Sequence, residues 1–224
     1  MASVIDICNL ALSHIGDRAN ITSIDPPEGS VQAEHCARYY PIARDTLLRM
    51  HPWTFAVKRV QLASAALIVP AAHPWQYSYA APGDLLTILG IYSGARQFDE
   101  NADEYEYEIG NDTNNTRVIF TNCDAATMRY VSLVTDSTRF PPLFTQAVSW
   151  MLASHLAGPV IKGEPGVKTA QAALQTGMSY ARQAMAQDAN ERRRNSVRND
   201  TRHTAPWLAN RALIWPYNDE PYQP

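Results

Sequence analysis

Two amphipathic helices are predicted within the first fifty residues. Apolar side chains recur every three or four positions from Ile5 to Ile15 and again from Ser30 to Met50, which is the spacing of one helix face. Ser3 precedes the first run and, with an acidic residue three positions later, is typical of a capping pair. Pro41 lies inside the second run. Because proline lacks a backbone N–H and clashes with the preceding turn, we expect it to kink that helix or to split it after Tyr40.

The pattern changes after Trp53 to one typical of an antiparallel sheet. Short runs rich in Val, Ile, Tyr and Thr alternate with clusters of Pro, Gly and Asn, which act as turn signals. We expect six strands, at Phe55–Leu62, Trp75–Ala80, Leu86–Tyr92, Glu104–Ile109, Arg117–Asn122 and Met128–Val134.

Helical spacing returns after Pro142. A first helix is expected to end at Gly158 and Pro159, and a second to run from Val167 to about Arg194. About 28 residues at about 1.5 Å each make a helix of about 42 Å. That length exceeds what a compact domain of this size needs, so we expect the second helix to project or to line an interface.

The predicted fold class is α+β, with a helical bundle, a central antiparallel β-rich subdomain and an extended C-terminal arm. Two N-terminal and two C-terminal helices, the last one long, form the bundle from residues 1–52 and 141–195. The β-rich subdomain is expected over residues 53–140 and the arm over residues 196–224. Because the arm is rich in proline and tryptophan, we expect it to lie on a surface and not to be a free tail.

The composition is that of an ordinary globular protein, with 224 residues, 46% of them hydrophobic, 18% charged and a formal charge of −3. It excludes a disordered chain, a collagen and a coiled-coil rod. No targeting segment or long apolar run is found, so we expect a cytoplasmic protein without membrane insertion. The three cysteines and six histidines lack the spacing of a metal site. We therefore expect reduced core thiols, no metal and no cofactor.

An acidic segment lies in the fourth expected strand. Alternation along a strand places Glu104, Glu106 and Glu108 on one face and Tyr105 and Tyr107 on the other. Paired carboxylates across a cleft could hydrolyse a glycoside. A general acid needs partial burial, however, and a run of like charges more often marks a solvated surface or the rim of an opening.

Arginines gather near the end of the chain, at Arg192, Arg193, Arg194, Arg198 and Arg202. They could neutralise nucleic-acid phosphates, with a strong salt dependence. Bidentate contacts to an acidic protein explain the same residues equally well, because bulky aromatic side chains that could anchor a protein interface follow in the arm. These aromatic residues are Trp207, Trp215 and Tyr217.

An ordered series of short motifs carries a resemblance to a known family. The motifs are Asp6–Leu12 with Ile15–Gly16, Cys36–Tyr40, Arg44–Leu48, Pro52–Ala56, Trp75–Tyr79 and Pro82–Asp84. Over roughly residues 3–195 the chain resembles the head-to-tail adaptors of short-tailed bacteriophages, also called tail tubular protein A.

This resemblance implies a structural virion protein and not an enzyme. Such adaptors form a ring, usually of twelve copies, at the head-to-tail junction. The ring joins the portal protein to the tail nozzle, with tail fibres as a further candidate partner, and double-stranded DNA passes through it. The virion would be assembled in the host cytoplasm.

The resemblance also suggests roles for particular residues. It implies packing roles in the structural core for Trp53, Phe55, Trp75 and Tyr77. It implies portal binding by the long helix and the arm, hence by Arg192, Arg193, Arg194, Arg198, Arg202, Trp207, Trp215 and Tyr217. We expect Glu104, Glu106 and Glu108 to face the channel or the nozzle, where negative charge would keep DNA from adhering.

Two alternatives from other classes stay open. One is a tail-associated enzyme that degrades peptidoglycan with a pair of acidic residues. The other is a DNA-binding protein that uses the arginine cluster. In the adaptor hypothesis, ring closure needs two different side surfaces, and the small side chains of the long helix would allow close contact between copies. Ordinary packing within one chain explains those small residues as well.

Overall fold

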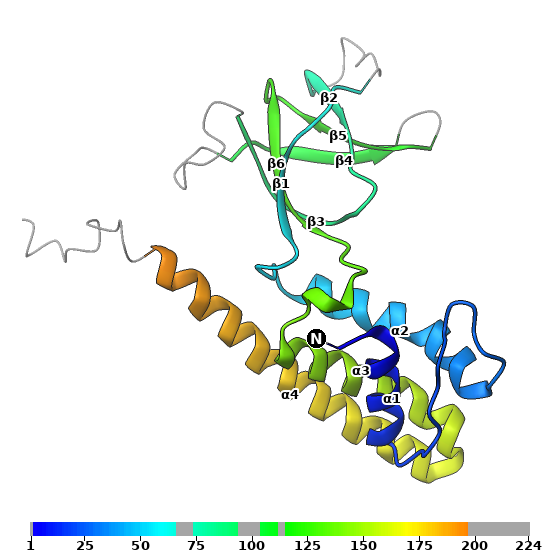
Figure 1. The fold of residues 1–224 in the computed structure, drawn as a ribbon. Helices are drawn as coiled ribbons and strands as arrows, with labels where there is room; N and C mark the ends of the chain where they lie inside the picture. The colour runs from blue at the N-terminus through cyan, green and yellow to red at the C-terminus, as the bar shows by residue number, and fades with distance from the viewer. Residues whose placement is uncertain (1, 66–73, 94–103, 112–114, 197–224) are drawn as a thin grey trace, which may run out of the picture. The chain divides into compact units, whose positions relative to one another are not determined.

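The computed structural model describes residues 2–65, 74–93, 104–111 and 115–196, with side chains as far as Glu191. The fold is mixed α+β, with four α-helices and two small antiparallel sheets in this part of the chain (Figure 1). The helices are α1 (Val4–His14), α2 (Val31–Met50), α3 (Pro142–Ile161) and α4 (Gly163–Ser196). The strands are β1 (Val57–Gln61), β2 (Tyr77–Ala80), β3 (Leu85–Ser93), β4 (Tyr107–Asn111), β5 (Arg117–Thr121) and β6 (Ala126–Ser132).

Helix α1 begins as its sequence predicts. The Ser3 hydroxyl accepts a hydrogen bond from the backbone N–H of Asp6 at 3.1 Å, and the Asp6 carboxylate accepts one from the backbone N–H of Ser3 at 2.8 Å. This reciprocal arrangement is a capping box, which satisfies two backbone donors at the helix start. The chain leaves the helix through Gly16, whose φ of +79° suits glycine.

Helix α2 continues through Pro41, so of the two expected outcomes, a kink at Pro41 or a split after Tyr40, the split is wrong. Buried side chains lie on both sides of the proline, among them Tyr40, Ala43 and Leu47. Tertiary packing of an amphipathic face contributes most of the stability of a helix in a protein. The packing of these side chains outweighs the one hydrogen bond that proline cannot donate.

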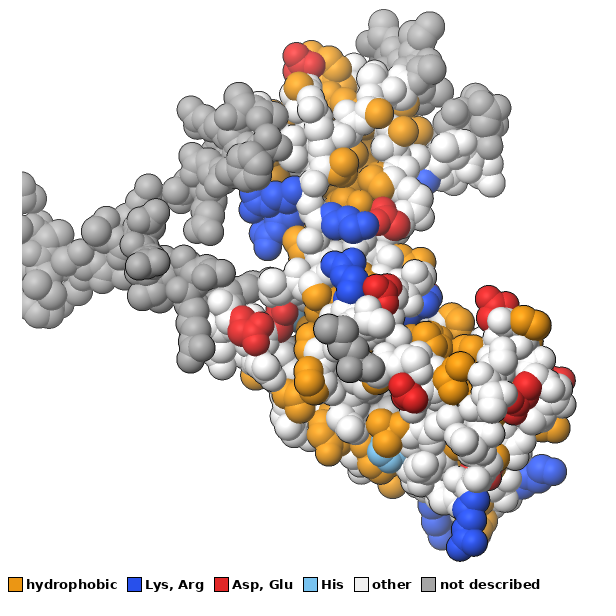
Figure 2. Space-filling view, in the orientation of Figure 1, with side chains coloured by type: hydrophobic (Ala, Val, Ile, Leu, Met, Phe, Trp, Pro, Cys, Tyr) orange, Lys and Arg blue, Asp and Glu red, His pale blue; other side chains and the backbone are white. Residues whose placement is uncertain are grey.

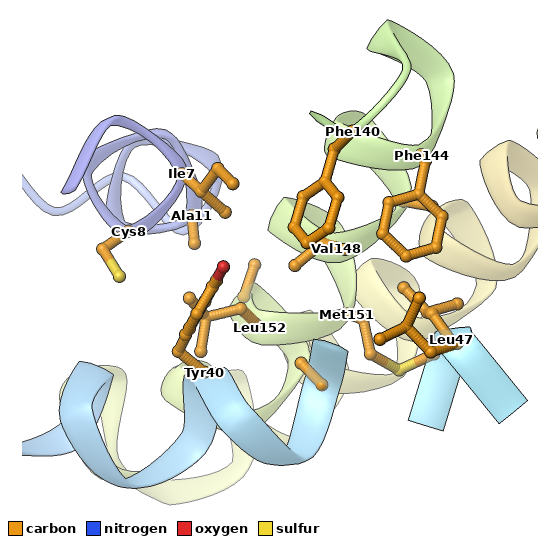
Figure 3. Packing of buried hydrophobic residues seen from close by; sticks show 14 of the residues in the cluster. Ile7, Cys8, Ala11, Tyr40, Leu47, Phe140, Phe144, Val148, Met151 and Leu152 are labelled. Carbon is orange, nitrogen blue, oxygen red and sulfur yellow. The ribbon is translucent and has the colours of Figure 1, made fainter. Parts of the chain in front are cut away.

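The four helices contribute to one hydrophobic cluster. Figure 3 shows Ile7, Cys8 and Ala11 of α1 in the same cluster as Tyr40 of α2 and Leu152 of α3. Helix α4 adds small side chains to the same cluster, at Ala173, Ala181 and Ala184. These three alanines are buried within the chain, so intramolecular packing accounts for them and they are not free for contact between copies.

Glycines allow α3 and α4 to approach closely. A Cβ atom on Gly177 would lie 3.1 Å from the backbone nitrogen of Met151, and one on Gly166 would lie 3.0 Å from the carbonyl oxygen of Ala157. The connection between the two helices is shorter than predicted, because α3 runs through Pro159 and only Lys162 separates the helices. Helix α4 has 34 residues, which at about 1.5 Å each is about 51 Å.

Both sheets have three strands, in the orders β1-β6-β3 and β2-β5-β4, and every pair is antiparallel. All six expected strands are present. The fourth begins at Tyr107 and not at Glu104, so the predicted alternation of Glu104 and Glu106 along a strand is wrong. A second hydrophobic cluster takes side chains from both sheets, among them Tyr79, Ile91, Ile119, Met128 and Tyr130.

The chain divides into two compact units, residues 1–188 and 189–224. All of the strands and the first three helices belong to the first unit. The boundary falls within α4, immediately after Asp188. No helix in the described ranges is long and apolar enough to cross a membrane.

Candidate functional site

The arginine cluster begins on the last turns of α4. Arg192, Arg193 and Arg194 lie within the helix, but their side chains are outside the described part of the structure. The other expected portal-binding residues, Arg198, Arg202, Trp207, Trp215 and Tyr217, also lie outside the described residues. For the expected portal-binding site, the structure therefore describes only helix α4, which leads to the arginine cluster.

A buried carboxylate attaches α4 to the chain segment that follows α2. Asp188 is only 7% exposed. One of its carboxylate oxygens accepts a hydrogen bond from the backbone N–H of Thr54 at 2.8 Å, and the other lies 3.0 Å from Nε2 of His51. The next three residues of α4 are exposed. Asp188 is thus the last buried residue of the helix before the arginine cluster.

Asp188 is not among the functional residues that the sequence pattern predicts. A signal for it was present, because buried residues recur along α4 every three or four positions, at Ala173, Gly177, Ala181, Ala184 and Asp188. An acidic residue at a position on the apolar face of a helix requires a polar partner, since an unpaired buried charge is costly. Its partners lie more than 130 residues earlier in the chain, and their identity could not be read from the helix itself.

Trp53 and Phe55 lie in the helical core. Trp53 is 1% exposed, donates its indole N–H to the carbonyl oxygen of Leu47 at 2.8 Å, and meets Phe144 edge to face with ring centroids 4.9 Å apart. The ring of Phe55 packs on Phe140 and Phe144, with centroids 5.8 Å and 5.1 Å away. These rings join the end of α2 to the start of α3.

Trp75 and Tyr77 are placed differently from the core positions expected for them. Tyr77 is 36% exposed, so its expected core position is wrong. Tyr77 is the first residue of β2, an edge strand that pairs with β5 alone. Its ring lies near that of Tyr79, with ring centroids 6.5 Å apart. Trp75 is half-buried and donates its indole N–H to Glu108 at 2.7 Å.

The acidic segment borders an open hollow of about 540 Å³. Its lining residues are Trp75, Glu104, Tyr105, Glu106 and Tyr107. Tyr105 donates its backbone N–H to the carbonyl oxygen of Ile91 at 2.9 Å, which ties the segment to β3. A carboxylate oxygen of Glu104 lies over Gly90, only 2.8 Å from where a Cβ would be. The structure therefore brings Trp75 and the acidic segment together, although sequence analysis assigned them separate roles.

Glu104, Glu106 and Glu108 are all exposed. The partial burial that a general acid for glycoside hydrolysis needs is not found at these three carboxylates. In the described ranges, no ion pair involves any of them. They form a solvated acidic surface beside aromatic rings.

Basic side chains gather elsewhere on the sheets. Figure 2 shows Lys and Arg side chains beside β1 and β6. Arg59 and Arg129 are directly paired in the register of these two strands, and Lys58 forms an ion pair of 2.6 Å with Asp84. Like charges opposite each other on a sheet disfavour the pairing. This surface was not anticipated, because the two arginines are 70 positions apart.

Within the part of the chain that the structure describes, no group of three or more His, Cys, Asp or Glu residues could hold a metal ion. Cys8, Cys36 and Cys123 are free and buried. A hydrogen bond with Cys36, together with burial, raises the pKa of the Cys8 thiol. A thiol with a raised pKa is a poor nucleophile at neutral pH.

Comparison with known proteins adds no family assignment. No protein-family model matches this sequence. A search of curated proteins finds no significant match either.

Proposed function

We propose that this protein is a structural connector of the head-to-tail adaptor type. In this proposal the four helices form a bundle, the two sheets form a β-rich part, and residues 196–224 form an arm that holds a portal protein. Copies of the chain form a ring, of twelve in the simplest case, at the head-to-tail junction of a virion. The ring leaves a channel for double-stranded DNA and joins a tail nozzle, with tail fibres as a further partner.

The observation that carries the proposal is the length of α4 and the place of its last buried residue. The helix has 34 residues, and its last buried residue among those with described side chains is Asp188, which His51 and Thr54 hold. A helix fixed in this way suits the presentation of the arginine cluster, and of the arm after it, to another protein. The ordered motifs that resemble the adaptor family support the same role.

The acidic surface has a part in the proposal. Glu104, Glu106 and Glu108 are exposed and have no ion-pair partner among the described residues. Negative charge at the channel or nozzle side of a ring would repel the phosphates of passing DNA. The connector needs no catalytic group, metal or cofactor.

Native mass spectrometry tests the connector directly. The purified chain is mixed with a portal ring, and the proposal expects a discrete complex with one chain per portal subunit. Removing residues 196–224 should abolish attachment while the far-UV circular dichroism of the helices and sheets is retained. Attachment of the truncated chain as strong as that of the full chain would overturn the role of the arm.

Charge variants separate the connector from its alternatives. Replacing Arg192, Arg193 and Arg194 together with alanine should weaken portal binding, whereas Lys168→Ala on the same helix should not. The DNA-binding alternative would be favoured if the parent chain bound duplex DNA and did not bind the portal ring. This DNA binding should fall steeply with salt and be lost in the triple variant. Release of sugar from purified peptidoglycan, lost in Glu106→Gln, would favour the enzyme.

A further inference from the structure

The hollow beside β4 combines aromatic and acidic residues. Its lining residues are three aromatic ones, Trp75, Tyr105 and Tyr107, and two acidic ones, Glu104 and Glu106. Tyr105 is 36% exposed, so a substantial part of its surface is open to solvent. The hollow has a volume of about 540 Å³ and is open to solvent.

Hydrogen bonding restrains the Trp75 ring at this hollow. Its indole N–H is donated to the carboxylate of Glu108 at 2.7 Å, and its only side-chain donor is thereby used. A carboxylate accepting this N–H also increases the electron density of the indole. The electron-rich face of a tryptophan attracts cations more strongly than that of tyrosine or phenylalanine.

The charge of the lining selects the ligand. Glu104 and Glu106 add negative charge, and no lysine or arginine within the described ranges forms an ion pair with them. A guanidinium or ammonium group can lie over an aromatic face and donate hydrogen bonds to carboxylates at the same time. A neutral sugar can stack on the rings but leaves the negative charge uncompensated.

We propose that this hollow binds the cationic side chain of an arginine or lysine in a basic segment of a partner protein. The aromatic rings of Trp75 and Tyr105 contact the cation, and Glu104 and Glu106 accept its hydrogen bonds. This inference goes beyond the connector role, because it names a ligand chemistry and does not depend on ring formation or on a portal protein.

Peptide titration tests the site with the full chain. Fluorescently labelled hexa-arginine and hexa-lysine are titrated with the protein at low salt, and their anisotropy is followed, with hexa-glutamine as the neutral control. We expect both basic peptides to bind and the neutral one not to bind. Tyr105→Ala and Glu106→Gln should each weaken binding by about threefold or more, in keeping with an exposed cation–π contact.

Matched controls separate the hollow from the general acidity of the protein. Glu164→Gln removes one exposed carboxylate from α4 and should leave the affinity unchanged. Trp75→Phe keeps an aromatic ring without the indole N–H and should weaken binding less than Trp75→Ala, with folding checked by circular dichroism. Equal affinity of all variants and the parent chain would overturn the proposal. The proposal would also be overturned if the protein bound chitohexaose and neither basic peptide. Loss of chitohexaose binding in Tyr105→Ala would then identify a glycan site.

Discussion

The carboxylate of Asp188 lies 3.0 Å from Nε2 of His51, although the two residues are 137 positions apart in the sequence. This contact joins helix α4 to the end of α2. The other carboxylate oxygen accepts the backbone N–H of Thr54 at 2.8 Å, so the two oxygens have different partners. A buried carboxylate held in this way both stabilises α4 and fixes the point from which the helix continues toward the arginine cluster.

Replacement of Asp188 by alanine should destabilise the protein. The change leaves the Thr54 N–H without this acceptor, and loss of one partner of a buried hydrogen bond costs about 1–3 kcal/mol. The free energy of unfolding, measured in urea, should fall by this amount. Asp188→Asn keeps an oxygen acceptor and should cost less. The exposed Glu164, which pairs with Lys168, supplies the control, because Glu164→Gln should change stability by less than about 0.5 kcal/mol. A cost for Asp188→Ala no larger than that of the control would contradict the proposed anchor.

Replacement by alanine should have different effects on stability at Gly158 of α3 and at Gly177 of α4. A Cβ on Gly177 would lie 3.1 Å from a backbone nitrogen and 3.3 Å from Cβ of Trp150, whereas nothing lies within 4 Å of a Cβ on Gly158. Alanine favours a helix over glycine by about 1 kcal/mol. Gly158→Ala should therefore raise the free energy of unfolding by up to about 1 kcal/mol. Gly177→Ala should lower it or leave it unchanged, and Gly177→Val should cost about 1–3 kcal/mol through overpacking.

Thermal melts of the three glycine variants, compared with the parent chain, measure these differences. The comparison needs no ligand or partner. Equal stabilisation by Gly158→Ala and Gly177→Ala would show that α3 and α4 can move apart without cost, contrary to the close packing described above.

Much of the local structure could be predicted from the sequence, because local signals determine it. The capping box at Ser3 and the six strands follow from short patterns of residues. The sequence predicts a helix that is either kinked or split at Pro41, and the choice between the two depends on packing against other helices. The exposure of Tyr77 depends on which strands are edge strands, and strand order is a property of the whole chain.

The candidate sites also combine features that local sequence predicts with features that depend on long-range contacts. The acidic segment was recognised from its residues, but its closeness to Trp75 depends on a hydrogen bond to Glu108 across 33 positions. The partners of Asp188 are more distant still. Side chains brought together by long-range contacts have no signature in a short window of sequence, so only the folded structure reveals the hollow and the anchor of α4.

The indole of Trp53 should contribute stability through its hydrogen bond as well as its packing. Trp53→Phe retains an aromatic ring against Phe144 but leaves the Leu47 carbonyl without the donor that lies 2.8 Å away. A buried acceptor that loses its partner costs about 1–3 kcal/mol, and the smaller ring adds a packing loss. Urea denaturation should show this decrease. Phe55→Leu, in the same aromatic group but without a polar atom, tests packing alone, and a cost for Trp53→Phe below that of Phe55→Leu would contradict a role for the hydrogen bond.

Acidification should destabilise the helical core through two histidines. His14 stacks on Trp150 with ring centroids 3.8 Å apart, and His155 stacks on Tyr39 at 5.7 Å. Burial lowers the pKa of both imidazoles. The unfolded chain, in which a histidine has a pKa near 6.5, therefore binds more protons than the folded chain in the window below that value. Stability from this source is fully present above about pH 6.5 and is lost as the pH falls through the unfolded pKa toward the lowered folded one.

Urea denaturation at a series of pH values from 7.5 down to 5 would measure this loss. The decrease in unfolding free energy between these limits should be smaller in His14→Gln and in His155→Gln than in the parent chain, because each variant removes one of the groups that take up a proton on unfolding. Replacement of His203, which lies outside the described residues, provides a comparison that keeps both stacked histidines. Equal pH dependence in the parent chain and in the double variant of His14 and His155 would show that these two rings are not the source, and the stability of the helical core at acidic pH would then depend on other groups.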